Sequence, residues 1–201
     1  MNLIISMEQN LSDILKFLKL LHLFQQVRRA TLVTGEDRQE NDFEHSYQLA
    51  MLGWYLIERK KLKLDSSLVV KYSLVHDLVE AYAGDTYTYG LVEKEVKHEK
   101  ETKAQKKLEE EFADFPEMNA LIKNYEERND EESRFVYALD KIIPMLNNYS
   151  DNGRTWKKHN ITLEMLINQK QGKVEVSPEC KAYFDELVEK LLNRPDLFPK
   201  D

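Results

Sequence analysis

The sequence predicts an all-α fold, and three observations support this prediction. Only six glycines and five prolines occur among the 201 residues, whereas folds built from many short strands need frequent turn residues. Apolar residues recur at spacings of three and four over most of the chain, which is the period of an amphipathic helix. The sequence contains no pair of alternating apolar segments joined by a hairpin turn.

The first predicted helix begins at an N-cap, either Asn10 or Ser12, and runs to about Val27. Short polar side chains at these positions can accept a hydrogen bond from the free backbone N–H groups of the first turn. A polar stretch follows, and Asp42 is then expected to cap a second helix. This second helix carries His45 among leucines at helical spacing.

The third predicted helix is capped by Asp65 or Ser66, and Gly84 ends it. Its apolar residues extend around much of the cylinder, so we expect it to be buried in the centre of the fold. A highly charged surface helix is expected over residues 93–112, and a proline begins a short helix over residues 116–127.

Two N-terminal signals and one glycine mark the remaining segments. Asp130, followed by two glutamates, favours the positive end of a helix dipole, and this helix carries Asp140. A short segment from about Thr162 is expected to end at Gly172. Ser177, followed by a proline, begins the last helix, which reaches about residue 193.

Composition is that of an ordinary globular chain with 42% apolar and 32% charged residues. We expect one domain over residues 1–201, with a motif-bearing core at about 11–146 and C-terminal helices at 160–194 packed on it. The net charge of −7 argues against binding polymeric nucleic acid or an anionic membrane, since both need a basic face. Cys180 is the single cysteine, which fits a reducing, cytoplasmic location. We find neither a signal peptide nor a membrane span.

Four residues on three predicted helices carry the chemistry of the sequence. Two are imidazoles and two are carboxylates, which are ordinary ligands for a divalent metal: His45, His76, Asp77 and Asp140. Helical folds can gather ligands from separate helices in their core. If the four converge, they form a mixed nitrogen and oxygen metal site, and metal-assisted hydrolysis is the expected chemistry.

Two further carboxylates lie close to this pattern in the sequence. Glu80 follows His76 by four residues and would share its helix face, where it is suited to act as a general acid or base. Asp85 follows Gly84 just beyond the expected helix end, where it can bind a water, a sugar hydroxyl or a leaving group.

The combined strings resemble a known family. The pattern of His45, His76-Asp77 and Asp140 is similar to the H…HD…D pattern of the HD-domain phosphohydrolases, which are all-helical metal-dependent enzymes. The run from Arg38 to Ser46, RQENDFEHS, resembles the lead-in of the 5′-deoxynucleotidase branch, in its bacterial members and their eukaryotic relatives. HDLVE at residues 76–80, continuing to GD at 84–85, and ALDK at 138–141 also resemble that branch.

The resemblance implies a function and a role for each site residue. The four residues of the pattern would hold one divalent ion, and Glu80 would deprotonate the attacking water or protonate the leaving 5′-oxygen. Arg29 or Arg28 would bind the phosphate, because a guanidinium recognises phosphate with two parallel hydrogen bonds. Asp85, with the neighbouring Thr86, would lie near the nucleoside sugar. The implied substrates are nucleoside 5′-monophosphates, deoxy forms before ribo forms.

Departures from the branch pattern leave the substrate open. The branch often has a tryptophan after its arginine, where this chain has Ala30, and it reads LPTP where this chain reads TYTY at residues 86–89. An HD-type phosphodiesterase or nucleotide triphosphohydrolase is one alternative, although no strong basic cluster is visible in the sequence. A non-catalytic nucleotide-binding HD module is another. The donor set suits Mn, Co, Fe, Ni, Zn or Mg, and the resemblance implies a homodimer.

Overall fold

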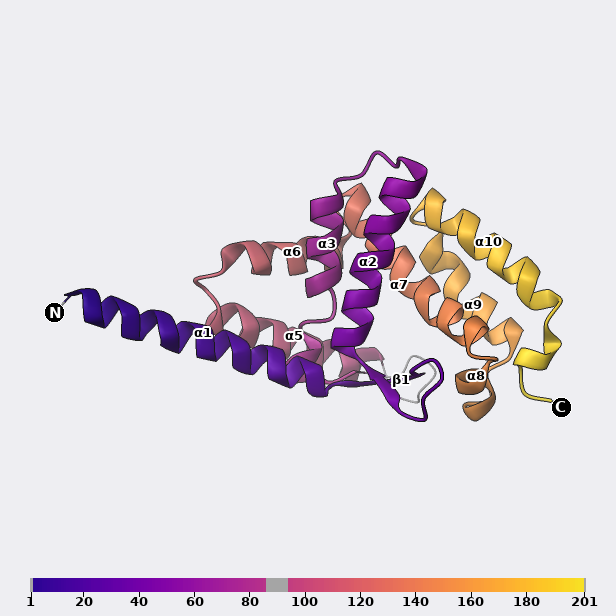
Figure 1. Ribbon diagram of the computed structural model, residues 1–201, viewed down its shortest axis with the longest axis horizontal. Helices are drawn as coiled ribbons and strands as arrows, with labels where there is room; N and C mark the ends of the chain where they lie inside the picture. The colour runs from indigo at the N-terminus through magenta and orange to yellow at the C-terminus, as the bar shows by residue number, and fades with distance from the viewer. Residues whose placement is uncertain (1, 86–93, 201) are drawn as a thin grey trace.

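The computed structural model describes residues 2–85 and 94–200 and is predominantly helical (Figure 1). Its elements, in chain order, are α1 (Asn2–Gln26), β1 (Arg28–Leu32), β2 (Gln39–Asn41), α2 (Asp42–Lys60), α3 (Ser66–Val75), α4 (Glu80–Ala83), α5 (Lys94–Glu111), α6 (Pro116–Glu127), α7 (Glu131–Ser150), α8 (Arg154–Lys158), α9 (Leu163–Val174), α10 (Pro178–Leu192) and a 3-10 turn, η1 (Pro195–Leu197). The predicted all-α class is confirmed. In the described part of the chain, no helix has both the length and the apolar character that crossing a bilayer requires.

A two-stranded antiparallel sheet interrupts the helices and was not predicted. Strand β1 pairs with β2 in an irregular register, and a turn with Gly35 at a φ of 79° joins them. Tertiary contacts hold this hairpin: the Leu32 amide donates to Thr155 Oγ1 at 3.0 Å, and Arg154 donates to the Val33 carbonyl at 3.0 Å. The strands are too short and polar to show an alternating pattern, so the sequence carried no signal for them.

Several predicted helix starts are confirmed and two are wrong. Asp65, Asp130, Thr162 and Ser177 each cap a helix by accepting backbone N–H groups. Helix α1 begins at Asn2, well before the predicted caps. Helix α2 is capped by Asn41 in a capping box with Glu44, not by Asp42. Asp42 is instead the first helical residue and is completely buried.

Two predicted helix ends also need correction. Helix α9 continues through Gly172 to Val174, because Val174 is buried and the helix packs on α7 and α10. Helix α3 ends at Val75, before His76, and a turn of i→i+3 hydrogen bonds connects it to α4. In that turn the amides of Leu78 and Glu80 donate to the carbonyls of Val75 and Asp77, at 3.1 and 2.8 Å.

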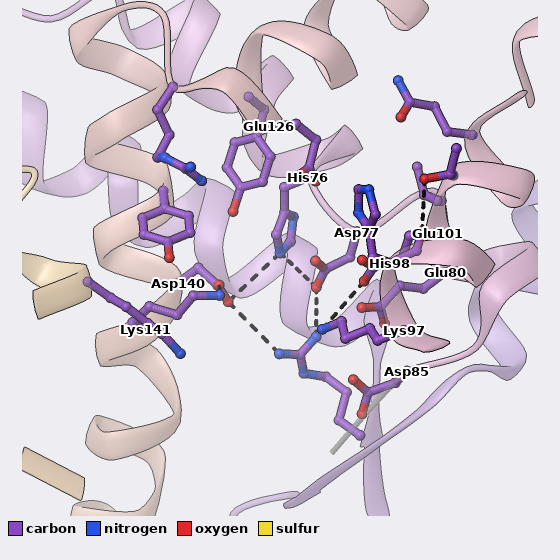
Figure 2. A pocket seen from close by; sticks show the side chains of 18 of the residues that line it. His76, Asp77, Glu80, Asp85, Lys97, His98, Glu101, Glu126, Asp140 and Lys141 are labelled. Atoms are coloured by element: carbon purple, nitrogen blue, oxygen red, sulfur yellow. Dashed lines mark hydrogen bonds and ion pairs between the residues drawn. The ribbon is translucent and has the colours of Figure 1, made fainter. Parts of the chain in front are cut away.

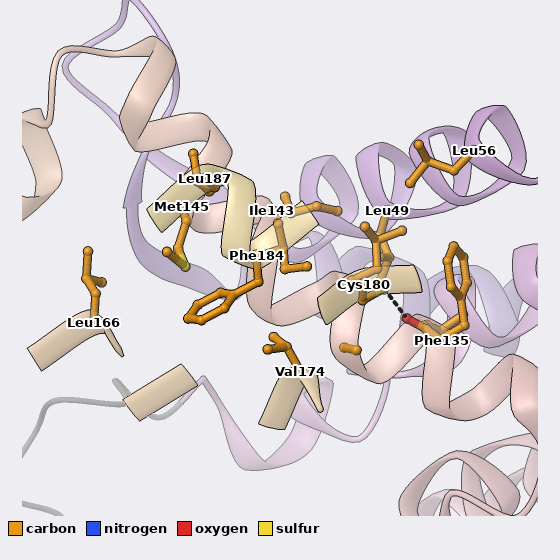
Figure 3. Packing of buried hydrophobic residues seen from close by; sticks show 14 of the residues in the cluster. Leu49, Leu56, Phe135, Ile143, Met145, Leu166, Val174, Cys180, Phe184 and Leu187 are labelled. Carbon is orange, nitrogen blue, oxygen red and sulfur yellow. Dashed lines mark hydrogen bonds between the residues drawn. The ribbon is translucent and has the colours of Figure 1, made fainter. Parts of the chain in front are cut away.

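Helix α7 lies at the centre of the main core, where it contacts α2, α3, α9 and α10. Figure 3 shows Phe135 and Ile143 of α7 among side chains of α2 and α10, such as Leu49 and Phe184. Gly53 lets α2 approach α3, since a Cβ there would lie 2.9 Å from Val69 Cγ1.

A smaller core joins α1, α4, α5 and α6 through residues such as Phe24, Leu78, Leu108 and Ile122. The α3 helix and the turn after it contribute to both cores: Val69 and Tyr72 belong to the main core, and Leu78 and Val79 to the smaller one. The turn that carries His76 and Asp77 is therefore held between the two cores.

Candidate metal centre and its pocket

Four side chains from three elements meet where α2, the turn after α3, and α7 come together. Each offers one ligand atom, and these atoms all lie within 4.8 Å of one another: His45, His76, Asp77 and Asp140. His45 and Asp140 are almost fully buried, at 0% and 2% exposed. The sequence pattern thus corresponds to a real cluster with the donor set of a divalent-metal site.

The hydrogen bonds of His76 fix which ring nitrogen faces the cluster. Its Nδ1 lies 2.9 Å from the Ser73 carbonyl, which can only accept, so Nδ1 carries the proton. In the neutral ring Nε2 then offers a lone pair toward Asp77 Oδ2, which is 2.9 Å away, and Nε2 forms no hydrogen bond with any described residue. Two lone-pair atoms at this distance in a buried site are stabilised by a nearby cation, and Arg29 lies 2.7 Å from the same Asp77 oxygen.

His45 contributes the second imidazole of the cluster and lies between two carboxylates. Its Nε2 lies 2.8 Å from Asp140 Oδ1, and its Nδ1 lies 3.6 Å from Glu40 Oε2. A proton on Nδ1 would face the Glu40 carboxylate and leave Nε2 free to bind an ion beside Asp140.

The Arg29 guanidinium lies inside the carboxylate cluster. It donates to Asp77 Oδ2 at 2.7 Å and to Asp42 Oδ1 at 3.1 Å, and lies 3.9 Å from Asp140 Oδ1. Burial acts to raise the pKa of Asp77, but its contacts with the His76 ring and with the Arg29 guanidinium outweigh burial and hold that pKa well below its usual range. Lys141, which is ion-paired with Asp140, has the same effect on the pKa of Asp140. Figure 2 shows His76 with dashed lines to Asp77 and Asp140, and Lys141 beside Asp140.

Glu80 lies beside Asp77, whereas the sequence predicted that it would share a face with His76 on a continuous helix. In a turn of i→i+3 bonds, residues three apart lie on one face, and Glu80, Asp77 and Asp42 offer carboxylate oxygens within 4.8 Å of one another. Burial, reinforced by the charges of Asp77, Asp85 and Asp42, raises the pKa of Glu80 well above its usual value. Burial and Asp77 likewise raise the pKa of Asp42 to about 6.

A cavity of about 750 Å³ opens beside the cluster, a volume suited to a small-molecule ligand. Its walls come from α5, α6, α7 and α9 as well as from the cluster. Figure 2 shows Lys97, His98 and Glu101 of α5 and Glu126 of α6 around His76 and Asp77. Basic side chains from distant parts of the sequence line it: Arg29, Lys97, Arg128, Lys141 and Lys173. The basic cluster that was not visible in the sequence is assembled by the fold.

The structure separates the two arginines proposed for phosphate binding. Arg29 enters the cluster, whereas Arg28 is exposed and donates to the Gln25 carbonyl at 3.3 Å. Neighbours on a strand point to opposite faces, so only one of the two can reach the site. Asp85 lines the cavity. Thr86, also predicted to bind substrate, lies outside the described residues, as do Tyr87, Thr88 and Tyr89.

Sequence reasoning missed several residues of this site. The sequence predicts Asp42 as a helix cap, whereas in the structure its Oδ2 is buried and has no hydrogen-bond partner among the described residues. Lys97 and His98 lie on a helix whose charge pattern is that of a solvated surface, and Tyr125 lines the pocket from α6. No local signal distinguishes these residues, because only the packing of α5 and α6 brings them to the cavity.

Comparisons with known proteins agree with this geometry. The HD domain family model matches residues 22–181. Among relatives, 5′-deoxynucleotidase HDDC2 of Homo sapiens is 29% identical over 144 residues, covering 69% of each chain. The HDDC2 enzyme of Dictyostelium discoideum is 26% identical over 172 residues, which cover 81% of this chain and 90% of the relative.

Solved structures give the same result. The crystal structure of a predicted metal-dependent phosphohydrolase from Magnetospirillum magnetotacticum MS-1 is 32% identical, with a TM-score of 0.81 and coverage of 94% of this chain and 96% of that one. An HD-domain phosphohydrolase from Listeria innocua, at 15% identity and a TM-score of 0.63, shares the fold. The family match over most of the chain, together with the cluster of two histidines and two aspartates, shows that the chain belongs to the HD domain family of metal-dependent phosphohydrolases.

Proposed function

We propose that this protein hydrolyses deoxynucleoside 5′-monophosphates to nucleoside and phosphate with the help of a bound divalent metal ion. The observation that carries the proposal is the buried cluster of four ligand atoms within 4.8 Å of one another, in which Nε2 of His76 lies 2.9 Å from a carboxylate oxygen and forms no hydrogen bond with any described residue. The ion would be held by His45, His76, Asp77 and Asp140. When bound, it supplies Lewis-acid polarisation of the phosphoryl group and acidifies water.

Arg29 is proposed to bind the phosphate group of the substrate. Its guanidinium already lies between three carboxylates, and a divalent ion at the cluster would take over part of the charge that Arg29 now balances. Its N–H groups can then turn to phosphoryl oxygens, for which the planar guanidinium is well shaped. Binding of the phosphate thus follows from an exchange of partners within a preformed site.

Glu80 is proposed as the group that moves a proton in the reaction. It lies beside Asp77 and lines the large cavity, and its pKa is raised by burial and by the neighbouring carboxylates, which favours its protonated form as a proton donor. It would take a proton from the attacking water or give one to the leaving 5′-oxygen. Asp85, at the edge of the same cavity, is proposed to accept a hydrogen bond from the sugar.

The names of the relatives support the deoxynucleotide substrate. They are 5′-deoxynucleotidases, and their sequences align with 70% and 69% of this chain. A second candidate, hydrolysis of nucleoside triphosphates, is favoured by one observation. The large cavity collects five basic side chains, more than a single phosphate needs.

The test is phosphate release from a panel of deoxy- and ribonucleoside 5′-monophosphates and triphosphates by metal-stripped protein resupplied with Mn, Co, Mg or Zn. We expect metal-dependent release of orthophosphate from the monophosphates, faster for deoxy forms. Release of triphosphate from nucleoside triphosphates would favour the second candidate. An absence of hydrolysis with every metal and substrate would refute the proposed activity.

A further inference from the structure

Lys170, on α9, is a buried cation without a partner in the described part of the chain. Lys170 is 8% exposed, and its side chain forms no hydrogen bond or ion pair with any described residue. Other basic groups near the centre are compensated: Lys141 pairs with Asp140, and Arg29 with Asp42 and Asp77. Buried lysines are rare unless paired, so an uncompensated one needs an explanation.

Lys170 lines a second, smaller cavity of about 100 Å³ on the side of the cluster that faces α8 and α9. The wall also includes Thr155 and Trp156 of α8, and Asn148 of α7, whose Oδ1 is buried without a described partner. Four residues line both this cavity and the large one: Arg29, Asp85, Asp140 and Lys141. The two cavities therefore adjoin at these four residues, of which Asp140 belongs to the metal cluster.

The sizes and charges of the two cavities differ in a way that matches the two halves of a nucleotide. The small cavity has room for a compact oxyanion but not for a nucleoside, whereas the large cavity has room for a nucleoside. Three cationic side chains border the small one: Arg29, Lys141 and Lys170. An oxyanion there would give the Lys170 ammonium a negatively charged partner. Lysine binds phosphate as a point charge.

We propose that the small cavity is the phosphate-binding pocket of the substrate and that Lys170 is a substrate-binding residue within it. The scissile ester bond then lies at the boundary between the cavities, beside the metal cluster, with the nucleoside in the large cavity. This inference rests on the proposed function, because it assigns the substrate's phosphate to the pocket.

The electrostatics of the empty pocket agree with this assignment. Burial, together with the nearby charge of Lys141, lowers the pKa of Lys170 to about 7. The ammonium is thus poorly stabilised in the free protein, and an anion would restore its stability. If Lys170 instead stabilised the fold, its replacement would lower the stability of the protein.

The experiment is calorimetric binding of inorganic phosphate to the metal-loaded protein and to three variants. Lys170→Met removes the charge, Lys170→Arg keeps it, and Lys158→Met removes an exposed lysine of the neighbouring helix α8 as the matched control. We expect Lys170→Met to weaken phosphate binding by about tenfold or more, as loss of one charge-assisted contact implies. Lys170→Arg should bind within a few-fold of wild type, and Lys158→Met should bind as wild type does.

Thermal unfolding in phosphate-free buffer completes the test. We expect the Tm of Lys170→Met to equal or exceed that of wild type, since replacing an uncompensated buried charge by an apolar side chain relieves a cost. A lower Tm with unchanged phosphate affinity would overturn the inference, as would a wild-type protein that binds no phosphate. If Lys170→Met does not fold, Lys170→Gln takes its place in the same comparison.

Failure of the inference and failure of the proposed function give different results. If no nucleotide is hydrolysed but phosphate binding still depends on Lys170, the activity is wrong and the anion pocket stands. If nucleotides are hydrolysed but Lys170→Met binds phosphate and turns over substrate with an unchanged KM, the activity stands and the pocket assignment is wrong.

Discussion

Arg29 is the internal cation of the carboxylate cluster, and replacing it tests that assignment directly. In Arg29→Met the side chain keeps its apolar length but loses the guanidinium that contacts Asp77 at 2.7 Å and Asp42 at 3.1 Å. Asp42 is completely buried, so its charge is left without compensation. We therefore expect a large loss of stability in the metal-free protein.

The expected magnitude follows from the two close contacts. Each attraction is worth roughly 4 kcal/mol at a charge separation of about 4 Å and an effective dielectric constant near 20. Desolvation of Arg29, whose side chain is 15% exposed, offsets part of this gain. Removal of one partner from such a buried set typically costs about 3–5 kcal/mol, and we expect a loss in this range.

The assay is urea unfolding of wild type and Arg29→Met, first with a chelator and then with saturating divalent metal. The difference between the two proteins should shrink when metal is present, because the ion then balances the carboxylates and binds more tightly where Arg29 no longer competes. Arg38→Met is the control, since Arg38 forms its ion pairs with Glu36 and Glu44 in solvent and should change little. Equal effects of the two substitutions, or a difference that metal does not reduce, would refute the reasoning.

Three further predictions address the proton-transfer group, the buried lysine and the end of the fold. Glu80→Gln should retain the metal content of wild type and lower kcat by about 10²- to 10⁴-fold; full activity would remove Glu80 from the mechanism. Lys170 has a pKa of about 7 in the folded protein and an ordinary value of 10.5, so the unfolded chain binds more protons between these pH values. Unfolding free energy should therefore rise across that range by a few kcal/mol more in metal-free wild type than in Lys170→Met; parallel pH curves from urea unfolding would contradict this. Gly153→Ala should lower the unfolding free energy by at least about 2 kcal/mol, because φ is 68° and the new Cβ would lie 1.8 Å from the Leu197 carbonyl; an unchanged Tm would contradict the close approach of α8 to η1.

The features that could be predicted from the sequence are those with local physical causes. Side chains such as Asp65, Asp130 and Ser177 cap their own helices, so the signal and the structure lie within three residues of each other. The four candidate metal ligands were found because their types and order are unusual and because flanking strings resemble a family. The structure then brings the four together.

The features that could not be predicted depend on contacts between distant segments. Arg28 and Arg29 are equivalent in sequence, and only the pairing of β1 with β2 decides which one faces the cluster. The change from helix to a tight turn at His76 places Glu80 beside Asp77, and no glycine or proline announces it. Lys170 belongs to the site only because α9 packs against α7.

The central claim is that the histidine and aspartate cluster binds a metal ion on which phosphate release depends. The most direct measurement is metal content and phosphate release from a deoxynucleoside 5′-monophosphate, determined on the same samples of wild type, Asp77→Ala and the exposed control Asp37→Ala. The account predicts stoichiometric metal and activity in wild type and Asp37→Ala, and loss of both in Asp77→Ala. An Asp77→Ala protein that keeps its metal and the wild-type rate would contradict the account.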